Sequence, residues 1–182
     1  MKKILIIFSV ICMMAVFTTK VMAQVTLAGN TAGAELVRVL TITNTTPLHF
    51  GVIGITAGTA GTVVMSTAGV RTPDAGTTTI INTGTQKTVA QFSLTGTAGA
   101  VYSIGLPSTI TVTTATGAGI KTMTIDALKV KVDAASEATA VLATGTLSGG
   151  LSSFLIGGTL NIVATQQVGI YAGTYNVTVD YN

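Results

Sequence analysis

The chain has 182 residues, with 9 basic and 6 acidic side chains and a formal net charge of +3. Three of the basic residues, Lys2, Lys3 and Lys20, lie within the first 23 residues, which contain no acid. The remaining 159 residues therefore carry six basic and six acidic side chains. A neutral body lacks the positive patch by which proteins bind nucleic acid, so we expect no nucleic-acid partner.

The first 23 residues have the organisation of a secretory signal peptide. Two lysines open the segment, residues 4–17 form an almost unbroken apolar run, and Ala23 ends a short stretch suited to signal peptidase. We expect cleavage after Ala23, export through the Sec pathway, and a mature chain in the periplasm, on the outer cell surface or outside the cell. A membrane span needs about 20 apolar residues. Lys20 interrupts this run, so we predict no transmembrane anchor in the mature chain.

The single cysteine, Cys12, lies inside the apolar run and leaves with it, so the mature protein has no disulfide. An exported domain without disulfides depends on packing and strand pairing alone. A chain of this length buries enough surface for one core. We therefore predict three parts: a signal peptide over 1–23, an N-terminal arm over 24–34 and a single domain over 35–182.

Threonine and glycine dominate the mature chain, with 33 and 21 residues respectively. β-Branched residues fit a pleated strand and are penalised in helices. Turn signals recur about every 8–12 residues, a spacing typical of a β-sandwich. We predict an all-β fold, an antiparallel immunoglobulin-like β-sandwich, with strands at 36–43, 48–55, 62–66, 77–82, 88–95, 101–106, 109–114, 123–132, 138–146, 154–163 and 174–181.

The sequence offers little for catalysis, and we predict a protein that is not an enzyme and binds no cofactor or metal. Its one histidine, His49, has no companions at the spacing that a metal site or a catalytic triad needs. Glycoside hydrolysis needs a pair of carboxylates, and the candidates for such a pair are Asp126, Asp133 and Glu137. They lie close in the sequence to two lysines, which favours a solvated strand face and turn instead.

The C-terminal strand has a clean two-residue alternation. Tyr175, Val177, Val179 and Tyr181 point to one face, and polar residues point to the other. This pattern predicts a strand with one buried and one exposed face. The sequence ends one residue later, at Asn182, so we expect no tail that covers an open sheet edge.

Five short phrases follow one another along the chain: PLHFG (47–51), GTVVM (61–65), AQFSLTG (90–96), YSIGLP (102–107) and AGTYNVTV (172–179). In this order they resemble a bacterial family, the domain of unknown function 4402. The resemblance covers about residues 37–182 and implies an exported β-sandwich of Gram-negative bacteria, with no activity attached to it.

The C-terminus is also similar to the subunits of chaperone–usher fimbriae, which end with a penultimate aromatic residue and a glycine fourteenth from the end. Here Tyr181 is penultimate and Gly169 is fourteenth from the end. The similarity implies a fimbria-like structural subunit that takes a missing strand from a neighbour's N-terminal extension. Val25 and Leu27 would be the apolar contacts of such a donor arm, and the partner would be another copy or another surface protein. The chain departs from many such subunits in lacking a disulfide.

A second hypothesis is a binding module of the cell envelope that recognises a glycan or a surface protein through its loops. The segment 68–76 is predicted to be a loop and carries Arg71 and Asp74. These two charged side chains are the first candidates for contact with such a ligand.

Overall fold

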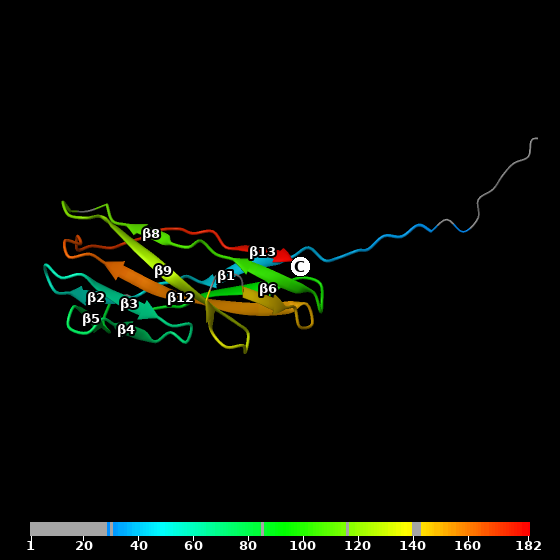
Figure 1. The fold of residues 1–182 in the computed structure, drawn as a ribbon, viewed down its shortest axis with the longest axis horizontal. Coiled ribbons are helices and arrows are strands. Elements are labelled where there is room, and N and C mark those ends of the chain that lie inside the picture. The colour runs from blue at the N-terminus through cyan, green and yellow to red at the C-terminus, as the bar shows by residue number, and fades with distance from the viewer. Residues whose placement is uncertain (1–28, 30, 85, 116, 140–142) are drawn as a thin grey trace, which may run out of the picture. The chain divides into compact units, whose positions relative to one another are not determined.

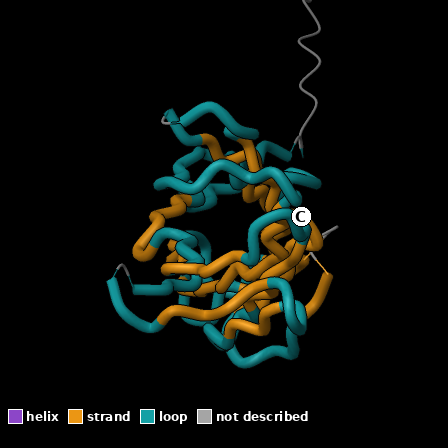
Figure 2. Tube along the Cα trace, turned by 90° about the vertical axis from the view of Figure 1, so that its left-hand side faces the viewer, coloured by secondary structure: helices purple, strands orange, loops and turns teal. Residues whose placement is uncertain are grey.

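The computed structural model describes residue 29 and residues 31–182, except 85, 116 and 140–142. By its internal contacts the chain divides between Glu35 and Leu36, and the fold presented here is that of the second unit, Leu36–Asn182. The described residues form strands and loops (Figures 1 and 2), and none of them belongs to a helix that is long and apolar enough to cross a membrane. All the strand pairs in the sheets are antiparallel. The prediction of an all-β fold with antiparallel sheets is thus confirmed.

Thirteen strands are described in Leu36–Asn182. They are β1 (Thr41–Thr46), β2 (Val52–Ile55), β3 (Gly61–Met65), β4 (Arg71–Pro73), β5 (Thr78–Ile81), β6 (Ala90–Thr95), β7 (Val101–Gly105), β8 (Ile110–Thr113), β9 (Thr122–Val132), β10 (Ala138–Thr139), β11 (Ala143–Thr146), β12 (Leu151–Ile162) and β13 (Thr178–Tyr181).

The largest sheet has eight strands and is organised around β12. Residues Phe154, Leu155 and Ile156 pair with both β6 and β9, so these two strands lie on opposite sides of β12. The far half of β12 pairs with β3, which continues the line of β6. The outer strands of this sheet are β1, which pairs with β6, β4, which pairs with β3, and β8 and β10, which both pair with β9. The sheet curls into a half-barrel. A three-stranded sheet in the order β11-β7-β13 and the pair β2-β5 complete the fold.

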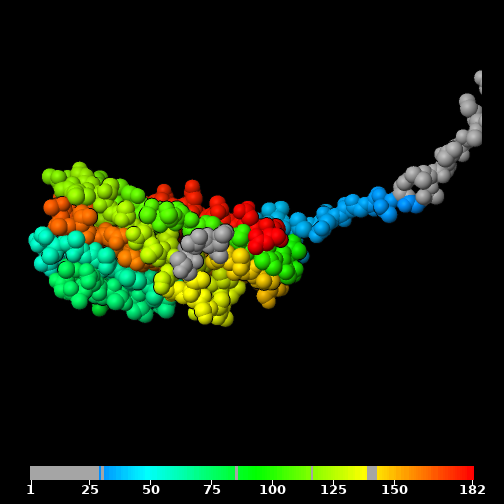
Figure 3. All heavy atoms as spheres, in the orientation of Figure 1, coloured from blue at the N-terminus to red at the C-terminus, as the bar shows by residue number. Residues whose placement is uncertain are grey.

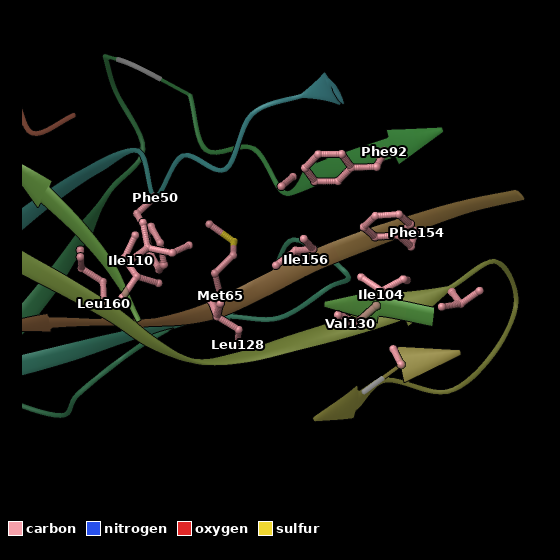
Figure 4. Close-up of a cluster of buried hydrophobic side chains, with 14 of the residues drawn as sticks. Phe50, Met65, Phe92, Ile104, Ile110, Leu128, Val130, Phe154, Ile156 and Leu160 are labelled. Atoms are coloured by element: carbon pink, nitrogen blue, oxygen red, sulfur yellow. The ribbon is translucent and has the colours of Figure 1, made fainter. Parts of the chain in front are cut away.

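The core lies on the inner face of β12 and its neighbours. Alternate residues of β12 are buried, and the Phe154 ring stacks on Phe92 of β6 with centroids 5.0 Å apart and an interplanar angle of 11° (Figure 4). Tyr102 and Ile104 of β7 are fully buried in the same cluster. The Tyr102 hydroxyl shares a 2.6 Å hydrogen bond with Ser152, so the three-stranded sheet is tied to β12 by apolar and polar contacts together.

The strand boundaries differ from the predicted ones at both ends of the domain. The first strand begins at Thr41 rather than residue 36, because residues 36–40 pair with none of the described strands. Residues 71–73, predicted to be a loop, form β4 because they meet the free side of β3. The last strand covers only Thr178–Tyr181 of the predicted 174–181, since only these residues pair with β7.

Candidate functional site

The first strand, β1, is an edge strand. It pairs with β6, from Thr41 opposite Thr95 to Thr46 opposite Gln91, and no described strand pairs with its other side. Five of its six residues are exposed. Its backbone amides and carbonyls on that side are free to pair with another strand.

The C-terminal strand, β13, is the second edge. It pairs with β7 and with no other described strand. The predicted alternation is present: Tyr175, Val177, Val179 and Tyr181 are partly buried and pack on the core, and the residues between them are exposed. In the space-filling view, the C-terminal segment, coloured red, lies on the surface of the domain (Figure 3).

The two edges are joined at one end by the Tyr181 side chain. Its hydroxyl donates to the carbonyl oxygen of Arg38 at 2.8 Å and accepts from the backbone N–H of Thr97 at 2.8 Å. The Arg38 N–H in turn donates to the Thr97 hydroxyl at 2.7 Å. Arg38 lies three residues before the start of β1. This cluster of hydrogen bonds therefore closes the space between the two edge strands at the Tyr181 end.

Away from this junction the two edges separate around a hollow of about 400 Å³, the β1 hollow. It is lined by Ile42, Asn44 and Phe92 on one side and by residues 175–178 on the other. The Tyr175 hydroxyl is buried there without a hydrogen-bond partner among the described residues. Burial raises the pKa of this phenol above its ordinary value.

A second hollow of about 360 Å³, the β2 hollow, lies farther along the same two stretches of chain. One wall comes from residues 48–53 and Ile55, and the other from residues 166–171. Apolar side chains of β8, β9 and β12 line it as well, including Val112, Ile125 and Leu160. Because both hollows have one wall from residues 42–55 and the other from residues 166–178, we treat them as one feature, the edge cleft.

The β2 hollow also has polar groups and exposed apolar residues in its lining. His49 Nδ1 accepts a 2.8 Å hydrogen bond from the Gly51 N–H, which fixes the imidazole ring. Val168 and Ile170 are exposed although large and apolar, at 70% and 89%. Exposed apolar groups beside a hollow are typical of a surface that binds something apolar.

The predicted assembly residues are distributed over this cleft as follows. Tyr175 and Val177 line the β1 hollow, Gly169 lines the β2 hollow, and Tyr181 closes the end of the cleft. Val179 lies on β13 opposite Ile104 of β7. The predicted donor residues, Val25 and Leu27, lie outside the described residues.

The two residues of the predicted binding loop have contacts within the domain. The Arg71 guanidinium donates to the carbonyl oxygens of Phe50, at 2.8 Å, and Val52, at 3.3 Å, and to Asn82 Oδ1, at 2.9 Å. It thereby ties β4 to the β2–β5 pair. The Asp74 N–H donates to the Thr62 carbonyl at 2.8 Å, which extends the β3–β4 hairpin.

The three carboxylates weighed for catalysis have different partners in the fold. Asp133 accepts hydrogen bonds from the hydroxyl of Ser152 at 2.6 Å and the N–H of Ser153 at 2.7 Å. Glu137 accepts from the hydroxyl and N–H of Thr67 and pairs with Lys129 at 3.2 Å. Asp126 lies on β9 opposite Thr159. Within the described part of the chain, no three histidine, cysteine or acidic residues gather as they would around a metal ion.

The chain matches the family described as a domain of unknown function (DUF4402) over residues 40–181. This match covers most of the chain, so the protein belongs to that family, as its sequence phrases indicated. No curated protein and no solved structure shows a significant match to the chain.

Sequence reasoning identified the C-terminal edge but not the second wall of the cleft. The stretch 48–53 was predicted to be part of a strand, whereas strand β2 begins only at Val52. Val168 and Ile170 flank Gly169, and this pair of large apolar residues around a glycine was the only sequence signal for the second wall of the cleft. Their exposure depends on the neighbouring strands, so the pattern alone gave no reason to select them.

Proposed function

We propose that the protein is an exported, non-catalytic structural subunit of the bacterial cell surface that assembles with other chains by strand exchange, as a fimbria-like subunit does. The family has no assigned activity, so the proposal depends on the site. The observation that carries it is the edge cleft, in which two strand edges without a described partner, β1 and β13, flank a hollow lined by apolar side chains, such as Ile42, Phe92 and Val177, and by polar ones.

An extended segment of another chain is the ligand that this geometry suits best. Exposed strand edges bind a further strand through backbone hydrogen bonds, and hollows beneath them accept alternate side chains. β1 and β13 run in opposite directions: β1 starts beside the junction of Tyr181 and Arg38 and runs away from it, whereas β13 runs toward the junction and ends there. A strand between them would pair with one in parallel and with the other antiparallel, and would join the two sheets.

The proposal includes an immunoglobulin-like sandwich, which the donated strand of another chain would complete. The curled sheet and the three-stranded sheet enclose one core, with β7 tied to β12 through Tyr102 and Ser152. An added strand between β1 and β13 would complete the two-layer arrangement along its open side. Export through the Sec pathway, with cleavage after Ala23, would place the domain where such assembly occurs, beyond the inner membrane of a Gram-negative cell.

The alternative, a binding module that contacts a glycan or a surface protein through the segment 68–76, has less support. The Arg71 guanidinium is engaged with two backbone carbonyls and Asn82. A glycan array tests this alternative: loop-dependent binding by a monomeric protein would favour it over strand exchange.

The test of strand exchange compares the mature chain, starting at Gln24, with a variant that lacks residues 24–34. We expect the mature chain to form a ladder of oligomers in size-exclusion chromatography and filaments in electron microscopy, and the variant to remain monomeric. A mature chain that is a stable monomer, and behaves identically without residues 24–34, would refute the proposal.

A further inference from the structure

The chain next to β1 has an exposed apolar segment that the domain itself does not use. Leu36 is 95% exposed and Val37 is 60% exposed. Arg38, the next residue, is held by the Thr97 hydroxyl and the Tyr181 hydroxyl through both its backbone groups. Arg38 is therefore the point at which the chain becomes part of the domain, and Leu36 and Val37 belong to the arm that precedes it.

The edge cleft has two different ends. At one end, the hydrogen bonds among Tyr181, Arg38 and Thr97 join its walls. The β2 hollow lies toward the other end and carries the exposed side chains of Val168 and Ile170. A strand that entered from the Tyr181 end would have to break this cluster, whereas a strand that enters from the β2 side leaves it intact.

From these observations a partner and a direction can be inferred, and this inference rests on the proposed strand exchange. We infer that the arm of a second copy of this chain enters the edge cleft from the β2 side, with Leu36 and Val37 at the β2 hollow. Earlier residues of the arm then run toward Tyr181, and Leu27 reaches the β1 hollow. The donor segment is thus longer than residues 24–34, and it lies parallel to β1 and antiparallel to β13.

The lengths of chain agree with this placement. The nine residues from Leu27 to Leu36 span about 30 Å in extended conformation, at about 3.3 Å per residue. On one wall the two hollows are separated by eight residues, Asn44 to Val52, which span at most about 26 Å because residues 47–51 are not part of a strand, so the arm is long enough to reach both.

The direction also determines what kind of assembly results. The arm leaves its own domain at the Tyr181 end and enters the next domain at the β2 end, so each contact joins two different surfaces. Contacts of this head-to-tail kind repeat from copy to copy and give an open filament when the rotation between copies does not close into a ring. Insertion of the arm from the Tyr181 side would instead bring two like ends together.

Disulfide cross-linking tests the direction directly, because the mature chain has no cysteine of its own. Two preparations of the mature chain are mixed, one of them tagged, so that a tagged–untagged disulfide reports contact between copies. Val37→Cys is combined with Val168→Cys, and Leu27→Cys with Asn176→Cys. We expect about tenfold more cross-linked dimer from these mixtures than from the exchanged mixtures, Val37→Cys with Asn176→Cys and Leu27→Cys with Val168→Cys, because a disulfide forms only between close Cα atoms.

Each other outcome overturns the inference. Stronger cross-linking in the exchanged mixtures would mean the opposite direction. Assembly without cross-linking in any mixture would mean that the arm lies elsewhere, while strand exchange by another segment would survive. Absence of assembly altogether would remove the proposed function as well as the inference.

Charge substitution in the arm gives an independent test with a matched control. Leu36→Asp combined with Val37→Asp is expected to abolish assembly and to leave the melting temperature of the monomer unchanged, because both side chains are exposed. Val39→Asp is the control, since Val39 is 82% exposed but lies on the domain side of Arg38. Equal loss of assembly in both variants would contradict the assigned role of Leu36 and Val37.

Discussion

β12 and β13 are both strands of the same domain, yet they differ in how completely they are paired. β12 has β6 and β3 on one side and β9 on the other, and seven of its twelve residues are buried. β13 has β7 on one side only, and none of its four residues is buried. The strand with both edges paired holds the core together, whereas the strand with a free edge is available to a partner. This difference separates the part of the domain that gives stability from the part that we propose for assembly.

The largest effect is expected at the centre of the fully paired strand. Phe154→Ala removes a fully buried ring that stacks on Phe92, and we expect the free energy of unfolding to fall by about 3–5 kcal/mol. Urea denaturation of the monomeric domain measures this loss. Leu151→Ala on the same strand is the control, since Leu151 is exposed and its truncation should cost less than about 0.5 kcal/mol. Equal losses in the two variants would contradict the assignment of the core to the inner face of β12.

A smaller effect is expected at the free edge. Tyr181→Phe removes the hydroxyl that bonds Arg38 and Thr97, and we expect a loss of about 1–2 kcal/mol in the free energy of unfolding. Tyr175→Phe is the matched control, because the Tyr175 hydroxyl is buried without a partner among the described residues. Its removal should leave the stability unchanged or raise it slightly. The opposite ranking of the two variants would show that Tyr181 does not join the two edges.

The smallest effect concerns pH and lies at Glu137, in the turn between β9 and β10. The pKa of Glu137 is held below its ordinary value mainly by the hydrogen bond from the Thr67 hydroxyl. The Thr67 N–H and the positive charge of Lys129 lower it further. A carboxyl group with a lowered pKa stabilises the fold above its unfolded pKa, about 4.3, and this contribution is lost as the pH falls through the folded value. We expect Glu137→Gln to reduce stability slightly at pH 7, and this deficit to shrink as the pH falls below about 4.3 and the Glu137 carboxyl group becomes protonated. Urea midpoints of both proteins measured across this range test it; a deficit that is independent of pH would contradict it.

Much of the fold was predictable because alternation is a local property. The alternation of Tyr175, Val177, Val179 and Tyr181 correctly indicated which side chains face the core. The strand boundaries were less predictable, because pairing needs a neighbour. Residues 36–40 are rich in apolar residues, as a strand is, but no described strand pairs with them. Arg71 looked like an exposed loop residue, and only the approach of residues 50–52 and Asn82 gave its guanidinium internal acceptors.

The sequence by itself determined the all-β class, the family and the inward face of the last strand. Each of these follows from residue types and a two-residue period that any extended chain expresses. The edge cleft was decided by the tertiary structure, because it exists only where residues 42–55 and 166–178, which are far apart in the chain, come to lie on either side of it. A local pattern can indicate which face of a strand is buried. It carries no information on which edge is left unpaired, since that depends on the number and order of strands in the sheet.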